Sequence, residues 1–359
     1  MTIRFFRRLA AVTALTLASG AMAPGAAAAM TPQDLFAKVS PDIWVVRAQH
    51  GASPTFAMGS AVAITPRLLV TACHVVNGAT GVTIARDNGK RVVKINTVTP
   101  DPNHNRDLCL LATDQALDAT PALIAPIESV KVGEKVYAIG SPLGLELTLT
   151  DGLVSALRVP PNETLPDIQT SAAVAPGSSG GGLFDEEGRL IGVTVAIASK
   201  ETDNLAFAYP AQWVMEMPAR IEAARKRWAD ALAANGVAMD PNGLPTGSGY
   251  AAIDNVGAVP TGGNSATGVG DAYKQFLLLN KPRAFMLTSD GRWGAVSDAD
   301  SLDGLLKDCA QRNVQCRLYA VDNTVVWRPD KAGPIPTAAT ATAAGATVSA
   351  PAQPPQPPR

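Results

Sequence analysis

The sequence predicts a mainly β protein, built as a barrel or a sandwich and followed by a small α/β unit. Short apolar segments with strand-like alternation recur between residues 43 and 157, separated by Gly, Pro and Asp turn signals. The apolar period changes to a helical one after residue 212. Beyond residue 271, short helical and strand-like segments alternate. These three observations place a β domain first and a separate small module behind it.

The β domain is expected over residues 30–235. A short helix at 31–40 opens it, with Leu35, Phe36 and Val39 on one face. The expected strands follow at residues 43–48, 58–65, 68–72, 82–86, 90–99, 108–113, 135–139 and 147–157. A helix at 212–235 ends the domain, with Pro218 at its start or at a kink. Its apolar residues lie three or four apart, which predicts a packing helix or, as the alternative, an oligomer contact: Trp213, Met217, Ile221, Ala224, Trp228 and Leu232.

The chain of 359 residues is long enough for two domains, and its remaining segments differ clearly in composition. Residues 236–270 are rich in Gly, Pro, Asn, Ser and Thr and predict a flexible linker. Residues 271–330 predict an α/β module, in which helices at 272–279 and 301–312 alternate with strands at 284–288, 293–296, 316–321 and 325–327. Residues 331–359 are Ala/Thr/Pro-rich, which predicts a disordered tail, with a polyproline ligand as the alternative.

Residues 1–29 have the organisation of a signal peptide. Arg4, Arg7 and Arg8 precede a short apolar run, and small residues follow at 27–29. The apolar run is shorter than the roughly 20 residues that span a bilayer, which argues against a membrane anchor. Removal of this segment leaves 27 basic and 31 acidic side chains. We therefore expect a periplasmic or secreted protein, and no basic patch indicates a nucleic acid partner.

A glycine-rich stretch, PGSSGGGLF at residues 176–184, follows the predicted strands. Glycine is used where backbone must bend sharply or approach another group closely. A serine in such a bend can present its hydroxyl as a nucleophile while backbone N–H groups face one cavity. The stretch taken alone is equally typical of an ordinary surface loop.

Two upstream residues favour the chemical interpretation. His74 lies in LLVTACHVV and Asp107 lies in HNRDLCLLA, each at the edge of an apolar strand. The chain order His, Asp, Ser is that of chymotrypsin-like serine proteases. His50 and His104 are alternative bases and Asp101 is an alternative acid, but none of them has the same strand-edge context.

Seven strings carry a family resemblance. In order, they are GSAVAIT, LLVTACHVV, DLCLLA, YAIGSPLGLELTLTDGLVSAL, IQTSAAVAPGSSGGGLF, GRLIGV and NLAFAYP. Together they resemble the trypsin-like protease domain of the HtrA/Deg family over residues 36–214, about half of the chain. The resemblance implies two six-stranded antiparallel barrels with a catalytic cleft between them. The PDZ domain that usually follows in this family is not seen, because residues 271–330 are too few and have another pattern.

The resemblance implies the roles of the site residues. His74 is the expected general base, Asp107 orients it, and Ser179 is the nucleophile because the matching serine stands directly before two glycines. Backbone N–H groups of Gly177 and Ser179 are expected to form the oxyanion hole, with Ser178 shaping the loop. We expect no metal ion and no cofactor, since no CxxC spacing is present and the three histidines are scattered.

The four cysteines predict two disulfides in an exported chain. Cys309 and Cys316 are close in sequence and form one expected pair. If His74 and Asp107 meet, their neighbours Cys73 and Cys109 also lie close together and form the second pair. Two buried free thiols are the alternative for Cys73 and Cys109.

The primary substrate pocket is inferred from the same resemblance. Ala173, six residues before the nucleophile, is placed at the pocket base, and no acid stands there. The pocket wall is expected from Gly192, Val193, Thr194 and Val195. This disfavours cleavage after Arg or Lys and favours small or medium aliphatic side chains.

Three classes of function are consistent with these residues. The first is a serine endopeptidase that degrades unfolded or damaged polypeptides. The second is a holdase or binding protein on a protease scaffold whose site is held closed. The third gives the main role to residues 271–330, as a module that binds an envelope partner. Assembly into a trimer is typical of some relatives and is a further expectation.

Overall fold

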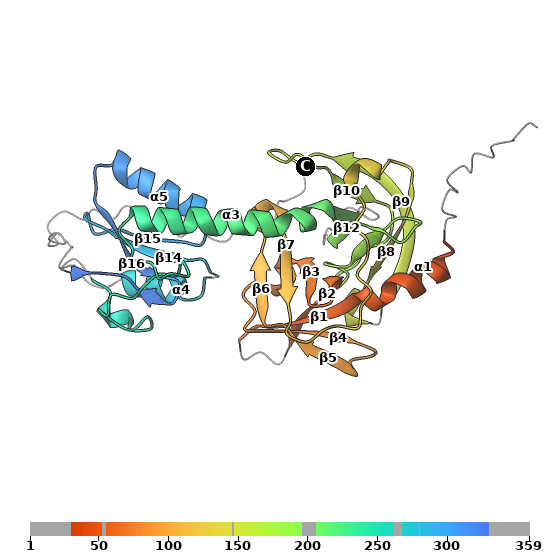
Figure 1. The fold of residues 1–359 in the computed structure, drawn as a ribbon, viewed down its shortest axis with the longest axis horizontal. Helices are drawn as coiled ribbons and strands as arrows, with labels where there is room; N and C mark the ends of the chain where they lie inside the picture. Colours follow the sequence, from red (N-terminus) through yellow and green to blue (C-terminus); the bar gives the residue numbers. More distant parts are fainter. Residues whose placement is uncertain are drawn as a thin grey trace, which may run out of the picture.

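The computed structural model describes residues 30–51, 55–145, 147–195, 206–260, 268–279 and 281–329. The predicted signal peptide and the predicted tail lie outside the described residues. In Figure 1 two β sheets form one body, and a smaller α/β unit lies at the far end of a long helix. The prediction of a mainly β fold is confirmed for the larger body.

The first sheet contains seven strands in the order β5-β4-β1-β2-β3-β7-β6. Their bounds are β1 (Ile43–Gln49), β2 (Phe56–Thr65), β3 (Leu68–Ala72), β4 (Gly81–Arg86), β5 (Arg91–Lys94), β6 (Thr97–Pro100) and β7 (Leu108–Ala112). The expected single strand at 90–99 is divided because the chain bends at Ile95 and Asn96, whose N–H groups bond Val82 and Ala112 on opposite sides. β5 and β6 are consecutive in the chain but form the two edges of this sheet, so the sheet must curl to bring its edges near each other. It has seven strands in an open order, whereas the expected barrel has six.

The second sheet is a closed barrel of six strands in the order β10-β13-β12-β11-β8-β9. Its strands are β8 (Lys135–Gly140), β9 (Thr148–Arg158), β10 (Asp167–Thr170), β11 (Gly182–Phe184), β12 (Leu190–Val195) and β13 (Ala206–Pro210). Small and aliphatic residues fill its interior, among them Ile168, Leu183 and Ile191. Closure pairs every strand edge, so the barrel offers a rigid frame for the loops at its rim.

A shared apolar core joins the two sheets. Val70 and Leu110 from the first sheet meet Tyr137, Phe184 and Val193 from the second. Two helices add to the same core, namely α1 (Pro32–Val39), which is capped by Thr31, and the first turns of α3 (Gln212–Ala234). The loops between the sheets are therefore held by one continuous packing interface.

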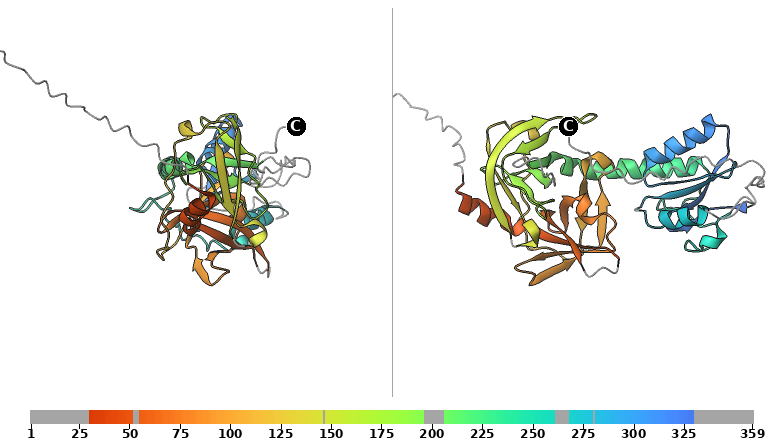
Figure 2. Two further views of the ribbon diagram at one scale, coloured as in Figure 1. Left: turned by 90° about the vertical axis from the view of Figure 1, so that its right-hand side faces the viewer. Right: turned by 180° about the vertical axis from the view of Figure 1, so that it is seen from behind.

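Helix α3 connects this body to the C-terminal module. Figures 1 and 2 show it running from the second barrel to the module without a break. Trp213 and Met217 near its start lie in the inter-sheet core, whereas Trp228 and Leu232 near its end lie in a core of the module. The expected packing role is therefore found at both ends. Pro218 lies inside the helix rather than at its start.

The module is a four-stranded sheet in the order β15-β14-β16-β17 with helices on both faces. Its elements are α4 (Val269–Phe276), β14 (Ala284–Thr288), β15 (Trp293–Val296), α5 (Ala299–Gln311), β16 (Cys316–Val321) and β17 (Thr324–Val325). Helix α5 and the end of α3 cover one face, and α4 covers the other with Tyr273 and Phe276. The order of helices and strands agrees with the one expected from the sequence.

The segment at 236–270 is not a free linker where the structure describes it, at 236–260 and 268–270. Val237 and Val259 are buried in the module's two cores. The Ser248 N–H donates to the Val325 carbonyl at 2.9 Å, and the Tyr273 hydroxyl donates to the Ile253 carbonyl at 2.8 Å. Scattered apolar residues among the Gly and Pro therefore attach this segment to the module, and helix α3 is the actual connection to the barrels.

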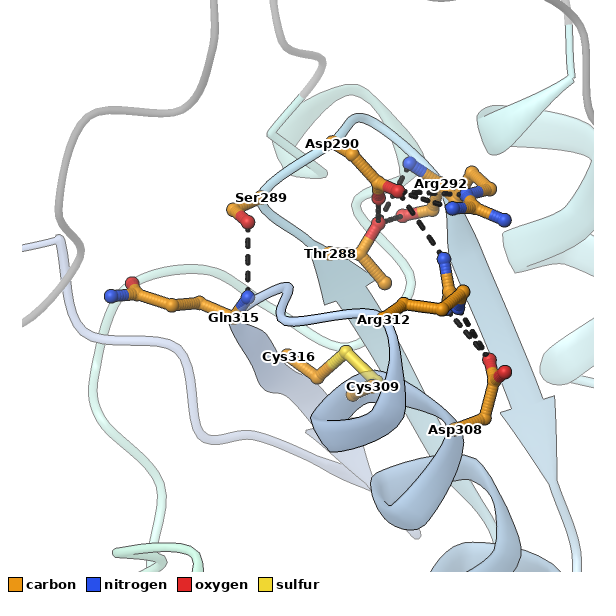
Figure 3. The surroundings of a disulfide bond; sticks show 9 residues. All are labelled: Thr288, Ser289, Asp290, Arg292, Asp308, Cys309, Arg312, Gln315 and Cys316. Carbon is orange, nitrogen blue, oxygen red and sulfur yellow. Dashed lines mark hydrogen bonds and ion pairs between the residues drawn. A yellow bond between two sulfur atoms is a disulfide. The ribbon is translucent and has the colours of Figure 1, made fainter.

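The disulfide between Cys309 and Cys316 ties α5 to β16, as predicted. Figure 3 shows it beside a charged cluster at the β14–β15 turn. Burial acts to raise the pKa of Asp290, but hydrogen bonds from Arg292 and Thr288 and the charge of Arg312 hold it below the ordinary value. The cluster fixes the turn at Asp290 and Gly291 between the two strands, where an Asp-Gly pair is typical of a hairpin.

The remaining short helices are α2 (Cys73–Val76), η1 (Ser40–Asp42), η2 (His104–Arg106), η3 (Ile127–Ser129), η4 (Pro142–Gly144) and η5 (Val256–Ala258). Within the described ranges, no helix has the length and apolar character that crossing a membrane requires.

Candidate active site

His74 and Asp107 meet because their strands pair. Strands β3 and β7 run antiparallel with Ala72 opposite Leu108, so Cys73 after β3 lies beside Asp107 before β7, and its N–H donates to the Asp107 carbonyl at 2.8 Å. His74 is the next residue. Nδ1 of His74 lies 2.5 Å from Oδ2 of Asp107, and the His74 backbone N–H donates to Oδ1 at 2.7 Å. The disulfide between Cys73 and Cys109 joins the same two segments, with 4.9 Å between the Cα atoms.

This geometry defines the state of the imidazole. A carboxylate only accepts hydrogen bonds, so the proton of a neutral imidazole is held on Nδ1 and Nε2 keeps a free lone pair. The His74 side chain is 39% exposed, whereas Asp107 is 11% exposed. A buried acid and an exposed ring place the basic nitrogen where a substrate could reach it.

The rival residues have other surroundings. Asp101 is buried and is paired with Arg220 of α3. Nε2 of His50 lies 3.0 Å from the Asn77 carbonyl. His104 lies in η2, and its side chain is outside those that the structure describes. Among the candidate acids and bases whose side chains the structure describes, His74 and Asp107 are the pair that it brings together.

The serine loop is a tight bend that needs glycine at two positions. Gly177 and Gly180 have φ angles of +95° and +86°. A Cβ at Gly177 would lie 2.6 Å from the Ser141 carbonyl oxygen, and one at Gly180 would lie 2.1 Å from the Ser60 carbonyl oxygen. Both positions therefore exclude any side chain. The loop holds Ser179 at 3% exposure between the two sheets.

Ser60 of β2 anchors this loop from the opposite sheet. Its hydroxyl donates to the Gly177 carbonyl at 2.9 Å and accepts from the Ser141 N–H at 2.8 Å. Its backbone N–H donates to the Ser179 carbonyl at 2.8 Å. Ser60 was not among the predicted site residues, although a serine inside the apolar strand GSAVAIT is the kind of buried polar residue that needs partners.

The peptide between Pro176 and Gly177 has a defined orientation. The Pro176 carbonyl accepts a hydrogen bond from the Leu143 N–H at 2.8 Å. Because the carbonyl and the N–H of a trans peptide point in opposite directions, the Gly177 N–H faces away from Leu143. The Ser178 carbonyl is held on another side, by the Thr194 hydroxyl at 2.8 Å.

A pocket of about 140 Å³ lies beside the serine loop. Ala173, Ser178 and Thr194 are in its lining, and none of its lining residues is charged: Ala138, Ile139, Gly140, Pro142, Thr148, Thr150, Ala173, Val174, Ala175, Ser178 and Thr194. The Thr150 hydroxyl donates to the Ala173 carbonyl at 2.8 Å and fixes this wall. The structure thus brings Ala173 next to the serine loop.

The expected wall at 192–195 needs correction. Only Thr194 of these four residues lines the pocket. Val193 is fully buried in the core between the sheets, because neighbouring residues of a strand point to opposite faces. A Cβ at Gly192 would meet Ala208 instead. The wall is formed by β8 and β9 residues, which the sequence analysis did not consider.

Comparison with known proteins agrees with this geometry. Residues 59–193 match the family described as "Trypsin-like peptidase domain". This part of the chain is therefore similar to trypsin-like peptidase domains. The matched range includes His74, Asp107 and Ser179. Within the described ranges, no group of three or more His, Cys, Asp or Glu residues is placed to hold a metal ion.

The curated relatives that match are named as serine proteases or endoproteases. A probable periplasmic serine endoprotease DegP-like of Halomonas elongata is 36% identical over 154 residues, which cover 42% of this chain and 31% of the relative. The periplasmic serine endoprotease DegP of Salmonella typhimurium is 33% identical over 174 residues, or 46% of this chain and 36% of the relative. This chain spans about a third of the length of these relatives.

One solved structure, "HtrA-type protease AlgW with tripeptide", aligns at 29% identity with a TM-score of 0.47. The alignment covers 54% of this chain and 64% of that one.

Proposed function

We propose that this chain is an exported serine endopeptidase that cleaves unfolded or damaged polypeptides through an acyl-enzyme at Ser179. The observation that carries the proposal is the pairing of His74 with Asp107 beside the tightly bent serine loop. An Nε2 lone pair on an oriented imidazole is what a weak hydroxyl nucleophile needs. The match of residues 59–193 to a peptidase domain supports the same reaction.

The proposed mechanism uses only groups of this site. Nε2 of His74 takes the proton of the Ser179 hydroxyl as the oxygen attacks the substrate carbonyl carbon. Asp107 stabilises the imidazolium that forms. The N–H groups of Gly177 and Ser179 bind the developing oxyanion. His74 then gives the proton to the leaving amine, and a water repeats the steps to release the acyl group.

The pocket supports the proposed preference for small or medium aliphatic side chains. Its uncharged lining offers no partner for Arg or Lys, and burying an unpaired cation is costly. Its volume of about 140 Å³ suits a branched aliphatic group. We expect substitution of Ala173 to alter which substrate side chain the pocket prefers.

The orientation of the Pro176–Gly177 peptide supports an active enzyme over a closed holdase. A closed site would turn the Gly177 N–H toward η4 and place the Pro176 carbonyl in the oxyanion hole. In the structure the Pro176 carbonyl points toward η4, because it accepts a hydrogen bond from the Leu143 N–H. Residues 30–235 are the proposed peptidase unit, and the residues from 236 to 329 are the proposed module. Trimer assembly and an envelope partner for the module remain predictions from the sequence, as does a periplasmic or secreted location.

The test is labelling of the mature protein with a fluorophosphonate probe, together with cleavage of an unfolded protein substrate. Ser179→Ala should lose both, because the probe reacts only with an activated serine. Ser155→Ala makes the same chemical change at an exposed position of β9 and should lose neither. Wild-type protein that is folded and oxidised but does not label would overturn the proposal. A wild type that labels but does not cleave the unfolded protein would show that the serine is activated and that only the proposed substrate class is wrong.

A further inference from the structure

The loop that carries Asp107 is residues 101–107, between β6 and β7, and it is called the acid loop below. Its own hydrogen bonds give it a compact shape. The Asp101 N–H donates to the Leu108 carbonyl at 2.8 Å and closes the loop at its base. Oδ1 of Asp101 accepts from the Asn103 N–H at 2.9 Å, and the Arg106 N–H donates to the Asn103 carbonyl at 3.0 Å.

Helix α3 holds one side of the acid loop through Arg220. Its guanidinium is paired with the carboxylate of Asp101, which is 2% exposed. The same guanidinium donates to the Trp213 carbonyl at 2.8 Å and lies 2.9 Å from Glu216. Three acceptors in three directions use the planar fork of arginine, which a lysine ammonium cannot reproduce.

The loop between β9 and β10 holds the other side. Arg106, directly before Asp107, donates to both carboxylate oxygens of Glu163, from Nη2 to Oε2 at 2.8 Å and from Nε to Oε1 at 3.2 Å. Glu163 also accepts from the Asn103 side chain at 2.7 Å. The Arg106 guanidinium lies 4.4 Å from the centre of the Trp213 ring. Both members of the Arg106–Glu163 pair are nearly buried, so movement of either side chain would leave the other as an unpaired buried charge.

These contacts lie outside the sheet to which Asp107 belongs. The acid loop connects strands of the first sheet, but Glu163 and α3 belong to the second barrel and its following helix. Within its own sheet, Asp107 is held by strand pairing and by the Cys73 N–H, which donates to its carbonyl at 2.8 Å. The acid loop as a whole is also held from the second barrel, through Arg220 and Arg106.

We propose that Arg220 is a positioning residue for the catalytic triad: acting through Asp101, it holds the acid loop so that Asp107 orients His74 toward Ser179. The inference rests on the proposed function and names a residue 41 positions beyond the nucleophile in the chain. Arg220 does not touch the substrate. Its loss is expected to reduce turnover while leaving the substrate pocket unchanged.

The test compares three variants with one control in the full-length protein. Arg220→Ala removes the guanidinium, and Arg220→Lys keeps the charge without the fork. Asp101→Asn keeps an oxygen for the Asn103 N–H and removes only the charge pair. Lys226→Ala is the control, because it removes a cation from the same helix at an exposed pair with Asp230.

We expect Arg220→Ala to lower kcat by about 10- to 100-fold, the range that a shift of about an ångström in a catalytic group produces. KM should change by less than about twofold, because the pocket at Ala173 and Thr194 is not touched. Arg220→Lys should recover part of kcat, and Asp101→Asn should resemble Arg220→Ala. Lys226→Ala should equal the wild type. If Arg220→Ala does not fold, Asp101→Asn decides the same question.

A spectroscopic measurement separates this inference from the proposed function. The chain has only three histidines, so the Nδ1–H signal of His74 can be assigned by NMR after histidine labelling. We expect the strongly downfield signal of a carboxylate-bonded imidazole in the wild type and in Lys226→Ala, and its loss or broadening in Arg220→Ala and Asp101→Asn. A folded Arg220→Ala protein with an unchanged signal and unchanged kcat would overturn the inference. A wild type that shows this signal but never labels with the serine probe would overturn the proposed function alone.

Discussion

Asp42 is a buried carboxyl group that makes stability depend on pH. It lies in η1 at 1% exposure, and its Oδ1 has no hydrogen-bond partner among the residues that the structure describes. Burial raises the pKa of Asp42 from 3.8 to about 7, although a hydrogen bond from the Thr120 backbone and the charge of Arg86 act to lower it. Neither Thr120 nor Arg86 belongs to the triad, so we expect the effect of Asp42 to be on folding.

The sign follows from proton binding. Between about pH 4 and pH 7 the folded state keeps a proton on Asp42 that the unfolded state has lost. The free energy of unfolding therefore falls as pH rises through this window. A difference of 3 pKa units corresponds to about 4 kcal/mol between the two limits. Asp42→Asn is always neutral, so it should remove this dependence and be the more stable protein at pH 8.

The assay is urea unfolding from pH 4.5 to pH 8, in a Ser179→Ala background that prevents self-cleavage. Asp118→Asn is the matched control, since it makes the same charge change at a side chain that is 88% exposed. We expect the difference between Asp42→Asn and its parent to grow with pH by several kcal/mol, and that for Asp118→Asn to stay flat. Parallel pH curves for Asp42→Asn and its parent would refute the reasoning.

Three further predictions concern the triad, the pocket and the module. Asp107→Asn should keep the fold but reduce kcat by roughly 10⁴-fold, because the imidazole loses the partner that selects its tautomer, as steady-state kinetics would show. Ala173→Asp should shift cleavage toward Arg or Lys in a peptide library, and an unchanged preference would contradict the pocket assignment. Arg283→Met should destabilise the module by about 2–4 kcal/mol in thermal unfolding, since Arg283 is buried and bonds the carbonyls of Phe276 and Leu279 at the end of α4. An unchanged melting temperature for Arg283→Met would show that these carbonyls find other partners.

The residues predicted from the sequence are those that local patterns mark. His74 and Asp107 stand at the ends of apolar strands, and a glycine-rich bend marks the serine loop. The expected strand at 90–99 was right in extent, but its bend at Ile95 and Asn96 depends on pairing with strands far away in the chain. The segment after residue 236 has the composition of a linker, and only the three-dimensional packing of Val237 and Val259 shows that it belongs to the module.

The residues that the sequence analysis missed act through contacts across the two sheets. Ser60 precedes the serine loop by more than 110 positions, and Arg220 follows the acid loop by about the same distance. Neither has a local motif, because a serine in a strand and an arginine on a helix are common residues. Their partners follow only once the strands are paired and the helix is packed.

Ser60 and Arg220 each reach from one sheet, or its following helix, to a catalytic loop of the other. This arrangement explains why the two sheets must stay together for catalysis. Ser60, from the first sheet, holds the serine loop of the second barrel. Arg220, from the helix after the second barrel, holds the acid loop of the first sheet. Each half of the triad is thus held by the sheet that does not carry it as well as by its own. A change that loosens the inter-sheet core around Trp213 would release both anchors together, so activity should be lost before either sheet unfolds. Since α3 passes from this core into the module with Trp228 and Leu232, the module shares its packing with the helix that holds the acid loop.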